Sequence, residues 1–246
     1  MYRFFIASGQ ISEGILRVTG EDVNHIKNVL RMKQGEDIEA VDENGLVTTA
    51  RIKSLTADEI LAGVLFSEPS GAELPNKITL FMGLPKFDKM ELIIQKAVEL
   101  GVSEIVPVTT RRTVVKLDAK KEASKRARWQ AIAESAAKQA KRSYIPSVGE
   151  VKTFSKALEE ARKMDTVLLP YECADNIEKT RAILGDIKSG ESIGVFIGPE
   201  GGFEKEEAEA AGKAGAKIIT LGKRILRTET AAIAILAVLM IGLEKN

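Results

Sequence analysis

The stretch that decides the fold is Ile193–Gly242, which reads IGVFIGPEGGFEKEEAEAAGKAGAKIITLGKRILRTETAAIAILAVLMIG. Its first five residues, Ile193–Ile197, form a short apolar run with β-branched members, which is typical of a buried strand. The run breaks at Gly198–Gly202, where three glycines in five residues allow positive φ angles and a close approach of the backbone to a ligand. Glu204–Ala214 then predicts an acidic, alanine-rich helix.

The same pattern repeats a few residues later. Ala216–Leu221 predicts a second buried strand, and Gly222–Thr228 predicts a second irregular loop. In open α/β sheets, ligands bind in the crevice at the carboxyl ends of the strands. We therefore expect the two glycine-broken loops to form one ligand site, although each loop could also be a tight strand-to-helix turn without a ligand.

The chemistry of the first loop argues against a phosphate ligand. A glycine-rich loop before a helix often binds phosphate, but the chain has neither the G-x-x-x-x-G-K-[ST] nor the G-x-G-x-x-G pattern. Glu200 lies in the loop, and Glu204, Glu206 and Glu207 crowd the start of the helix, where they would repel an anion. A cationic or zwitterionic ligand fits these residues better.

Two motifs in this stretch resemble a known family. They are I-G-P-E-G-G-F at Ile197–Phe203 and L-G-K-R-I-L-R-T-E-T-A at Leu221–Ala231. Together they resemble the paired signature of the SPOUT-superfamily methyltransferases, and more closely the RsmE family, which methylates N3 of a uridine in 16S ribosomal RNA. Two further segments, His25–Ile38 and Glu134–Pro146, also resemble patterns of that family.

The resemblance implies a fold and a reaction. The fold is a SPOUT α/β-knot, a parallel sheet with a C-terminal trefoil knot, preceded by a PUA-like β-barrel that binds RNA. The reaction is methyl transfer from S-adenosylmethionine (SAM) to uridine N3. It requires positioning and removal of the N3 proton, and no metal. Because N3 lies on the Watson–Crick edge, the base must be unpaired or flipped out.

The resemblance also assigns residues. SAM binding falls to three strand-end segments, with the members Leu169, Pro170, Glu172, Gly198, Pro199, Glu200, Gly201, Leu221, Gly222, Ile225, Leu226 and Arg227. We expect Arg142 to hold the uracil or its phosphate, and either Arg227 or Glu229 to assist with the proton or the charge that develops at the base. An ordinary surface ion-pair row remains an alternative for the face that carries Arg142.

The order of the predicted elements indicates two domains. Residues 1–68 show short strands and an Asn-Gly hairpin signal at Glu43–Gly45, which is typical of a small barrel. Residues 69–76 are rich in Pro and Gly and read as a linker. Residues 77–246 alternate strand and helix, which predicts a mainly parallel sheet. Within this part, Asp88 and Glu91 suggest a helix-capping pair.

Charge is unevenly distributed, although the net charge is only +1. Residues 111–142 hold eleven Lys or Arg against three Asp or Glu. Such a segment can bind a polyanion, and the alternative is a solvated helix face. Arginines in the loops at both ends of the predicted helix favour RNA. The residues that we assign to RNA binding are His25, Lys27, Arg31, Arg111, Arg112, Lys138 and Arg142.

Composition excludes other classes. His25 is the single histidine, so a histidine-based metal site or a Ser-His-Asp triad is implausible. Helix packing or capping is an alternative role for it, which we favour modestly over RNA contact. One cysteine and the absence of a signal-peptide pattern fit a cytoplasmic protein. The apolar run Ala231–Ile241 is too short to span a membrane. We expect a helix buried on all sides, partly by a second subunit, hence a homodimer.

Two other functions remain open at this level. The same scaffold could serve a non-catalytic RNA-binding or ribosome-assembly protein. It could also carry a SPOUT enzyme that methylates another atom, such as a ribose 2′-oxygen or a guanine nitrogen. The second glycine-broken loop argues against a pure binder, which has no need of it.

Overall fold

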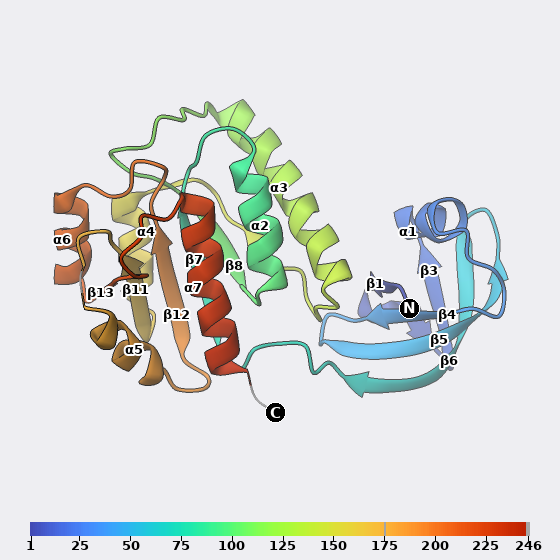
Figure 1. Cartoon of the computed structure of the whole chain (residues 1–246). Helices are drawn as coiled ribbons and strands as arrows, with labels where there is room; N and C mark the ends of the chain where they lie inside the picture. The colour runs from blue at the N-terminus through green and yellow to red at the C-terminus, as the bar shows by residue number, and fades with distance from the viewer. Residues whose placement is uncertain (175, 245–246) are drawn as a thin grey trace. The chain divides into compact units, whose positions relative to one another are not determined.

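The computed structural model describes residues 1–174 and 176–244. Asp175, Lys245 and Asn246, which fall within the predicted C-terminal domain, lie outside the described residues. Contacts within the chain cluster into two compact units (Figure 1). Unit 1 comprises Met1–Glu73 together with Ala137–Ile145, and unit 2 comprises Leu74–Ala136 and Pro146–Asn246. Each unit is described by itself below.

Unit 1 is built on a six-stranded sheet in the order β1-β4-β5-β6-β3-β2. All strand pairs are antiparallel except β1 with β4. The strands are β1 (Arg3–Phe5), β2 (Ile11–Ser12), β3 (Ile15–Thr19), β4 (Asp37–Val41), β5 (Leu46–Leu55) and β6 (Glu59–Pro69). In the β4–β5 turn only Gly45 takes a positive φ, of 77°. The Asn-Gly signal therefore predicts the hairpin correctly but assigns one positive φ too many.

A short helical stretch closes one end of this sheet. It consists of α1 (Glu21–Asn24) and the π-helical turn η2 (His25–Val29); a separate 3-10 turn, η1 (Ser8–Gln10), precedes β2. Val23 and Ile26 from this stretch join the core of the sheet, which also contains Phe4, Leu16 and Ile38. The second half of this stretch is wound as a π-helix.

The segment Ala137–Ile145 belongs to unit 1, whereas the sequence places it in the C-terminal domain. Lys138 donates to Asp22 at 3.2 Å, and Lys141 lies 3.8 Å from a carboxylate oxygen of Glu39. Arg3 donates to the backbone carbonyl of Lys141. These contacts join positions more than a hundred residues apart, so no local pattern could have indicated them.

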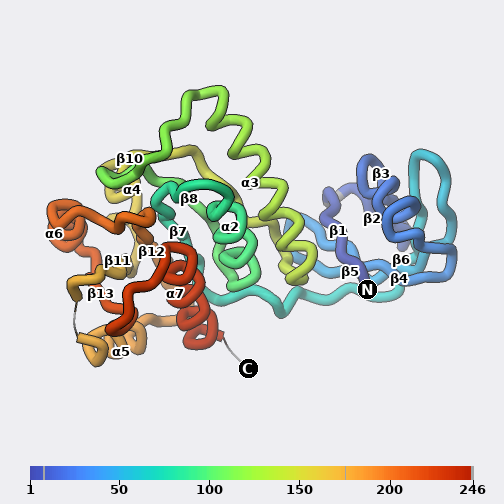
Figure 2. The backbone as a smooth tube through the Cα atoms, turned by 45° about the horizontal axis from the view of Figure 1, so that its top comes forward, coloured from blue at the N-terminus to red at the C-terminus, as the bar shows by residue number. Residues whose placement is uncertain are grey.

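Unit 2 is built on a fully parallel sheet in the order β10-β8-β7-β12-β11-β13, with β9 also paired to β8 (Figure 2). The strands are β7 (Lys77–Gly83), β8 (Glu104–Thr109), β9 (Ser147–Val148), β10 (Lys152–Thr153), β11 (Thr166–Pro170), β12 (Ser192–Ile197) and β13 (Lys217–Ile219). The helices are α2 (Lys89–Glu99), α3 (Ala119–Gln139), α4 (Phe154–Ala161), α5 (Ile177–Gly185), α6 (Lys205–Lys213) and α7 (Thr228–Leu243). The last turn of α3 passes into unit 1.

The central strands of unit 2 are buried on both faces, as their apolar runs predict. Phe81 of β7 stacks on Phe196 of β12 with ring centroids 4.5 Å apart, and Phe154 of α4 packs edge-on against Phe196. Helices α2 and α7 lie side by side (Figure 1). This packing fixes β7, β11, β12 and β13, and hence the loops that leave their carboxyl ends.

One local prediction in unit 2 is wrong in part. Asp88 is the N-cap of α2, but its side chain makes no capping hydrogen bond; Glu91 instead pairs with Arg128 at 2.7 Å. Within the chain, helix α7 exposes Val238 (51%) and Ile241 (73%), so the cover that we expect from a second subunit stays a prediction. Among the described residues, no helix combines the length and apolar character that spanning a bilayer requires.

Candidate functional site

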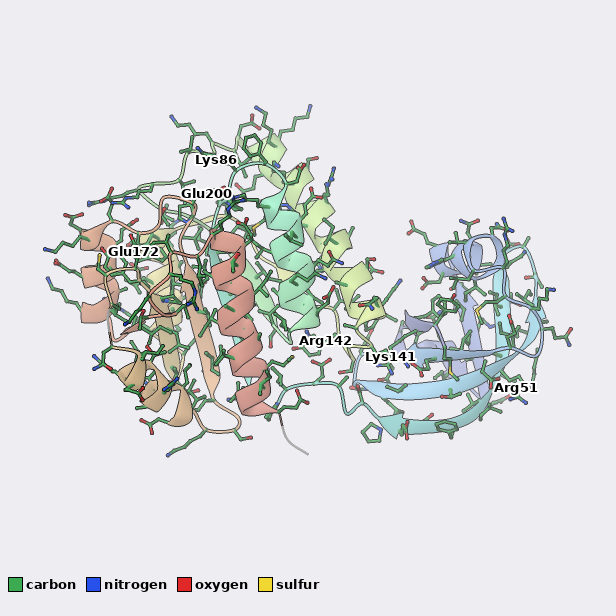
Figure 3. All side chains as sticks on the ribbon, in the orientation of Figure 1. Arg51, Lys86, Lys141, Arg142, Glu172 and Glu200 are labelled. Carbon is green, nitrogen blue, oxygen red and sulfur yellow. The ribbon has the colours of Figure 1, made fainter. Side chains whose placement is uncertain are left out.

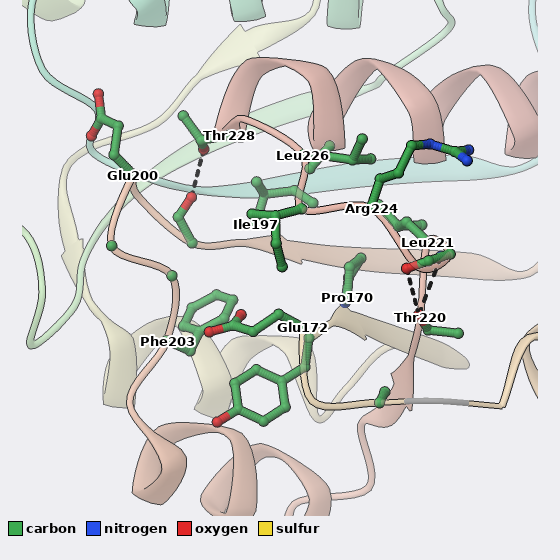
Figure 4. A pocket seen from close by; sticks show the side chains of 18 of the residues that line it. Pro170, Glu172, Ile197, Glu200, Phe203, Thr220, Leu221, Arg224, Leu226 and Thr228 are labelled. Atoms are coloured by element: carbon green, nitrogen blue, oxygen red, sulfur yellow. Dashed lines mark hydrogen bonds between the residues drawn. The ribbon is translucent and has the colours of Figure 1, made fainter.

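The two glycine-broken loops meet around one cavity of about 540 Å³ at the carboxyl ends of β11, β12 and β13 (Figure 4). The lining residues are Pro170, Tyr171, Glu172, Ala174, Ile177, Ile197, Gly198, Pro199, Glu200, Gly201, Gly202, Phe203, Thr220, Leu221, Gly222, Lys223, Arg224, Ile225, Leu226, Thr228 and Ala231. A cavity of this size and mixed polarity is typical of a small-molecule site.

The first loop, Gly198–Phe203, requires its glycines for steric reasons. A Cβ on Gly198 would lie 2.9 Å from the carbonyl carbon of Gly202, and backbone cannot yield at that distance. Gly202 takes a φ of +70°, and its amide donates to the carbonyl of Pro199 at 2.8 Å. A Cβ on Gly83, at the end of β7, would lie 2.6 Å from Pro199. The loop is therefore folded tightly on itself and against the neighbouring strand.

Arg112 holds this loop from outside. Its guanidinium donates to both carboxylate oxygens of Glu204, at 2.9 and 3.1 Å, and to the carbonyl of Gly201 at 2.6 Å. The hydrogen bond to Glu204 raises the pKa of Arg112, and that to Arg112 lowers the pKa of Glu204. This fork geometry fixes two points of the loop at once.

The N-terminus of helix α6 is occupied by a glutamate side chain of the same helix. Glu207 is buried, and its carboxylate accepts from the backbone amides of Glu204 and Arg111, each at 2.9 Å. Arg111 also donates to Glu206 at 3.2 Å. A phosphate at this position would compete with a buried carboxylate, so the structure supports the expectation that the loop is not a phosphate site.

The second loop, Gly222–Arg227, is anchored mainly at its ends. Thr220 is fixed by Thr180 of α5, whose hydroxyl donates to the Thr220 carbonyl at 3.2 Å and accepts from its amide at 3.1 Å. The buried Thr228 hydroxyl donates to the carbonyl of Gly198 at 2.6 Å and so joins the two loops (Figure 4). Between these anchors, Ile225 is 83% exposed.

A lysine joins carboxylates of the two motifs. Lys89, in the first turn of α2, places its Nζ 3.3 Å from both Glu200 and Glu229. The Lys86 amide also donates to Glu200, at 3.0 Å (Figure 3). Partial burial raises the pKa of Glu200, but backbone amides and Lys89 outweigh it, so the net shift is downward. The Glu200 carboxylate is therefore turned toward α2 at the edge of the cavity.

Most of the residues predicted to bind the cofactor line the cavity. The ten that do are Pro170, Glu172, Gly198, Pro199, Glu200, Gly201, Leu221, Gly222, Ile225 and Leu226. Leu169 does not, because its side chain is fully buried in the core beside Phe196. Arg227 is the exposed N-cap of α7 and lies outside the lining. Their assignment to the cofactor remains a prediction without support from the cavity.

Sequence reasoning missed other lining residues, notably Tyr171, Thr220, Arg224 and Thr228. Each lies next to a predicted residue, so the motif positions signalled the region but not which side chains face inward. The Thr220 hydroxyl accepts a hydrogen bond from the Gly222 amide, and the Thr228 hydroxyl donates one to the Gly198 carbonyl.

Arg142, which we predict to contact uracil, has a different environment from the one expected. It belongs to unit 1, is 2% exposed, and pairs with Glu73 through a nitrogen–oxygen distance of 2.7 Å (Figure 3). Glu73 also accepts from the amide and hydroxyl of Ser143. The structure gives Arg142 a packing role in unit 1. Of the three predicted catalytic residues, Glu229 is the one that pairs with Lys89. Lys89 also pairs with Glu200, which lines the cavity.

The predicted RNA-contacting residues are mostly engaged within the chain. Arg111 and Arg112 are held against the start of α6, which accounts for arginines at that end of α3 without RNA. Lys27 donates to the carbonyl of Thr56, and His25 packs edge-on to Phe4 at 6.1 Å, the packing role favoured from the sequence. Arg31 is exposed with a φ of 54°.

Trp129 is buried in unit 2. Within the described residues, no group of three or more His, Cys, Asp or Glu side chains is arranged to hold a metal ion.

Comparison with known proteins matches both parts of the chain. Residues 72–240 match the RNA methyltransferase domain family, and residues 18–65 match the RNA methyltransferase PUA domain family. The ribosomal RNA small subunit methyltransferase E of Bacillus subtilis is 38% identical over 237 residues, covering 94% of this chain and 93% of that protein. The chain belongs to the ribosomal RNA small subunit methyltransferase E family.

Further members of this family agree. The Mesomycoplasma hyopneumoniae enzyme of the same name is 35% identical over 96% of this chain and 97% of its own length. The crystal structure of the Neisseria gonorrhoeae enzyme, bound to S-adenosylmethionine, superposes with a TM-score of 0.82 at 36% identity, covering 96% of both chains. The PUA-like first unit and the parallel α/β sheet of the second unit, as expected for a SPOUT methyltransferase, are thereby confirmed.

Proposed function

We propose that this protein transfers a methyl group from SAM to N3 of a uridine in 16S ribosomal RNA. The observation that carries the proposal is the convergence of both family motifs on one cavity of about 540 Å³. Family membership and the SAM-bound relative support the cofactor. The family resemblance supports the target atom, which is the finer part of the proposal.

The residues present fit SAM. Gly198 and Gly201 have no Cβ where one would meet the Gly202 backbone or the Arg112 side chain, so the first loop can pack tightly and form one wall of the cavity. Apolar side chains such as Ile177, Leu221, Ile225 and Leu226 supply surface for an adenine ring. The Glu172 carboxylate lies beside Gly202, where a Cβ would be 3.2 Å from it. Acidic groups at the cavity favour a cation such as a sulfonium or an ammonium.

SAM supplies an electrophilic methyl group, so the protein needs to position two reactants and accept one proton. The first loop holds its shape through Arg112 and Thr228 and so orients the donor. Apolar lining residues exclude water. Glu229 is available to accept the uridine N3 proton, because Lys89 fixes its carboxylate next to Glu200, which lines the cavity.

The partners follow from the same proposal. The substrate is 16S rRNA, in line with the names of the relatives, which state small-subunit ribosomal RNA for those proteins, and the site of action is the cytoplasm. The exposed Val238 and Ile241 on α7 give the apolar surface expected of a homodimer interface.

The test is direct. Purified protein is incubated with SAM and unmodified 16S rRNA, and the nucleosides are analysed by mass spectrometry. We expect 3-methyluridine in one position, and its loss in the Gly198→Ala variant but not in Gly212→Ala. Gly212 is a matched control because a Cβ there meets only Ile218, at 3.8 Å. SAM binding by calorimetry without any methylated nucleoside would favour the non-catalytic alternative; another methylated atom would correct the target.

A further inference from the structure

Phe87, in the loop between β7 and α2, combines two locally unfavourable features. Its side chain is 85% exposed, and its backbone takes a φ of +58°. A bulky residue rarely adopts a positive φ, because the conformation brings its Cβ against the backbone. The other non-glycine residues with positive φ in the described chain are polar, namely Glu13, Arg31 and Lys141. Strain of this kind is frequently found at functional sites.

A cavity of about 120 Å³ lies beside the ring of Phe87. Neighbours of Phe87 form one wall, and residues 111–136 supply another, with Val115, Leu117 and the buried Trp129 as apolar members and Lys125 as the cation. The Lys125 ammonium sits 5.8 Å from the centre of the Trp129 ring. The surface therefore presents an exposed flat ring next to an apolar hollow with a positive charge at its rim.

The charge around this surface suits an RNA strand. Residues 111–136, which supply one side of the cavity, carry eight Lys or Arg against three Asp or Glu, and four of these cations, Arg111, Arg112, Arg126 and Arg128, pair with glutamates outside this range. Asp88 also lines the cavity. Arg128 donates to Glu91 at 2.8 Å, and this hydrogen bond, followed by the charges of Glu91 and Asp88, raises the pKa of Arg128. The lysines of this side, with Lys125 at the cavity, favour a phosphate backbone, and the exposed ring favours the face of a base.

The loop is also tied to the proposed SAM site. The amide of Lys86, the residue before Phe87, donates to Glu200 at 3.0 Å, and Glu200 lines the large cavity. Figure 3 shows Lys86 and Glu200 at the same end of unit 2. A base that lies on the Phe87 ring is therefore held at the edge of the site where the methyl donor would bind.

We propose that Phe87 is a stacking platform for the unpaired base that the RNA must present for methylation. The inference rests on the proposed function for its substrate. A base whose N3 must approach the methyl group of SAM has to leave its helix. An aromatic face then replaces part of the stacking that the base loses. Stacking is tolerant of base identity, so Phe87 positions the base and other residues choose it.

The experiment measures binding of a fluorescein-labelled oligouridine by anisotropy, with SAM binding by calorimetry as a separate readout. We expect Phe87→Ala to weaken oligouridine binding by between about fivefold and about a hundredfold, and Phe87→Trp to retain it. Phe87→Gly should lose the same affinity although its backbone strain is relieved. SAM affinity should be unchanged in all three. Val114→Ala is the matched control, since Val114 is also an exposed apolar residue, at 66%, but lies outside the cavity lining.

Three results would overturn the inference. One is oligouridine binding by Phe87→Gly that equals the wild type. Another is loss of SAM binding in Phe87→Ala, which would make the loop part of the cofactor pocket only. The third is a change of oligomeric state in Phe87→Ala by light scattering, with RNA binding kept, which would assign the ring to a partner subunit. A protein that binds oligouridine through Phe87 but methylates no rRNA would refute the proposed function and leave the stacking site in place.

Discussion

The two loops that form the large cavity both follow a glycine-containing motif, but the first is held along its length and the second only at its ends. The first, Gly198–Phe203, is fixed along its length: its carbonyls accept from Thr228 and Arg112, and Gly83 presses against Pro199. The second, Gly222–Arg227, is held at its ends and exposes Ile225 between them. A Cβ on Gly222 would meet no atom within 4 Å, although its φ is +109°.

The difference teaches that a glycine-rich motif can serve two purposes. In the first loop the glycines make room for neighbouring backbone, so the wall of the cavity exists before a ligand arrives. In the second loop the glycine permits an unusual turn, and the residues after it have few contacts of their own. We infer that the first loop is a preformed wall and that the second gains its contacts from the ligand.

Gly198→Ala is expected to have the largest effect on this comparison. Its Cβ would lie 2.9 Å from the Gly202 carbonyl carbon, so the preformed wall must move. We expect SAM affinity by calorimetry to fall by about a hundredfold or more, because small displacements at a site are costly. Gly212→Ala should bind as the wild type. Normal binding by Gly198→Ala, with an unchanged melting temperature, would show that the first loop is not rigid.

Arg112→Ala removes the brace of the first loop without touching the cavity. We expect SAM affinity to fall by about tenfold, with partial recovery in Arg112→Lys, because an ammonium cannot span Glu204 and the Gly201 carbonyl in a fixed fork. Arg126→Ala is the control, since Arg126 pairs with Glu150 in an exposed ion pair. Equal SAM affinities in Arg112→Ala and Arg126→Ala would show that the first loop keeps its shape without Arg112.

Ile225→Ala tests the second loop. Its side chain is 83% exposed without a ligand, so the melting temperature of the free protein should not change. SAM affinity should fall by between about threefold and about tenfold, if the ligand covers part of this side chain. Leu65→Ala, at a 48% exposed position in unit 1, is the control. A lower melting temperature with unchanged SAM affinity would contradict ligand-dependent contacts.

The smallest expected effect concerns pH. The pKa of Glu200 is lowered from its ordinary value of 4.5, so its ionised form stabilises the fold above that value, and the contribution is lost as the pH falls through the lowered pKa. The melting-temperature difference between the wild type and Glu200→Gln should be constant from about pH 8 to about pH 5 and shrink below it. Glu178→Gln, in an exposed pair with Arg181, should show little difference throughout. If the melting-temperature difference between the wild type and Glu200→Gln grew as the pH fell, the pKa of Glu200 would be raised and not lowered.

Sequence reasoning succeeds where the pattern is local. The run Ile193–Ile197 gives β12 to within one residue, and the breaks after Ile197 and Leu221 give the two loops of the cavity. Periodicity finds these because a buried parallel strand is apolar throughout and stops at glycine. The trefoil knot remains a prediction from the family resemblance, because the way in which a chain is threaded does not change the spacing of its apolar residues.

Sequence reasoning fails where a partner is distant. Arg142 looks available beside other basic residues, but Glu73, 69 residues earlier, buries its charge. Arg112 looks like an RNA contact, but Glu204 lies 92 residues further on. Leu169 belongs to a motif segment, yet its position on the strand turns it into the core. A motif shows that a segment matters, whereas the direction of each side chain depends on tertiary packing.

The hydrogen bond from Thr228 to Gly198 has a consequence for biosynthesis. The two residues are 30 positions apart, and Glu229, which follows Thr228, reaches Glu200 only through Lys89. A nascent chain that has emerged as far as β12 can pair that strand with β7, but its glycine turn lacks both ties until α7 has left the ribosome. Competence to take up a small molecule is thus acquired late in translation, after the central strands have already assembled.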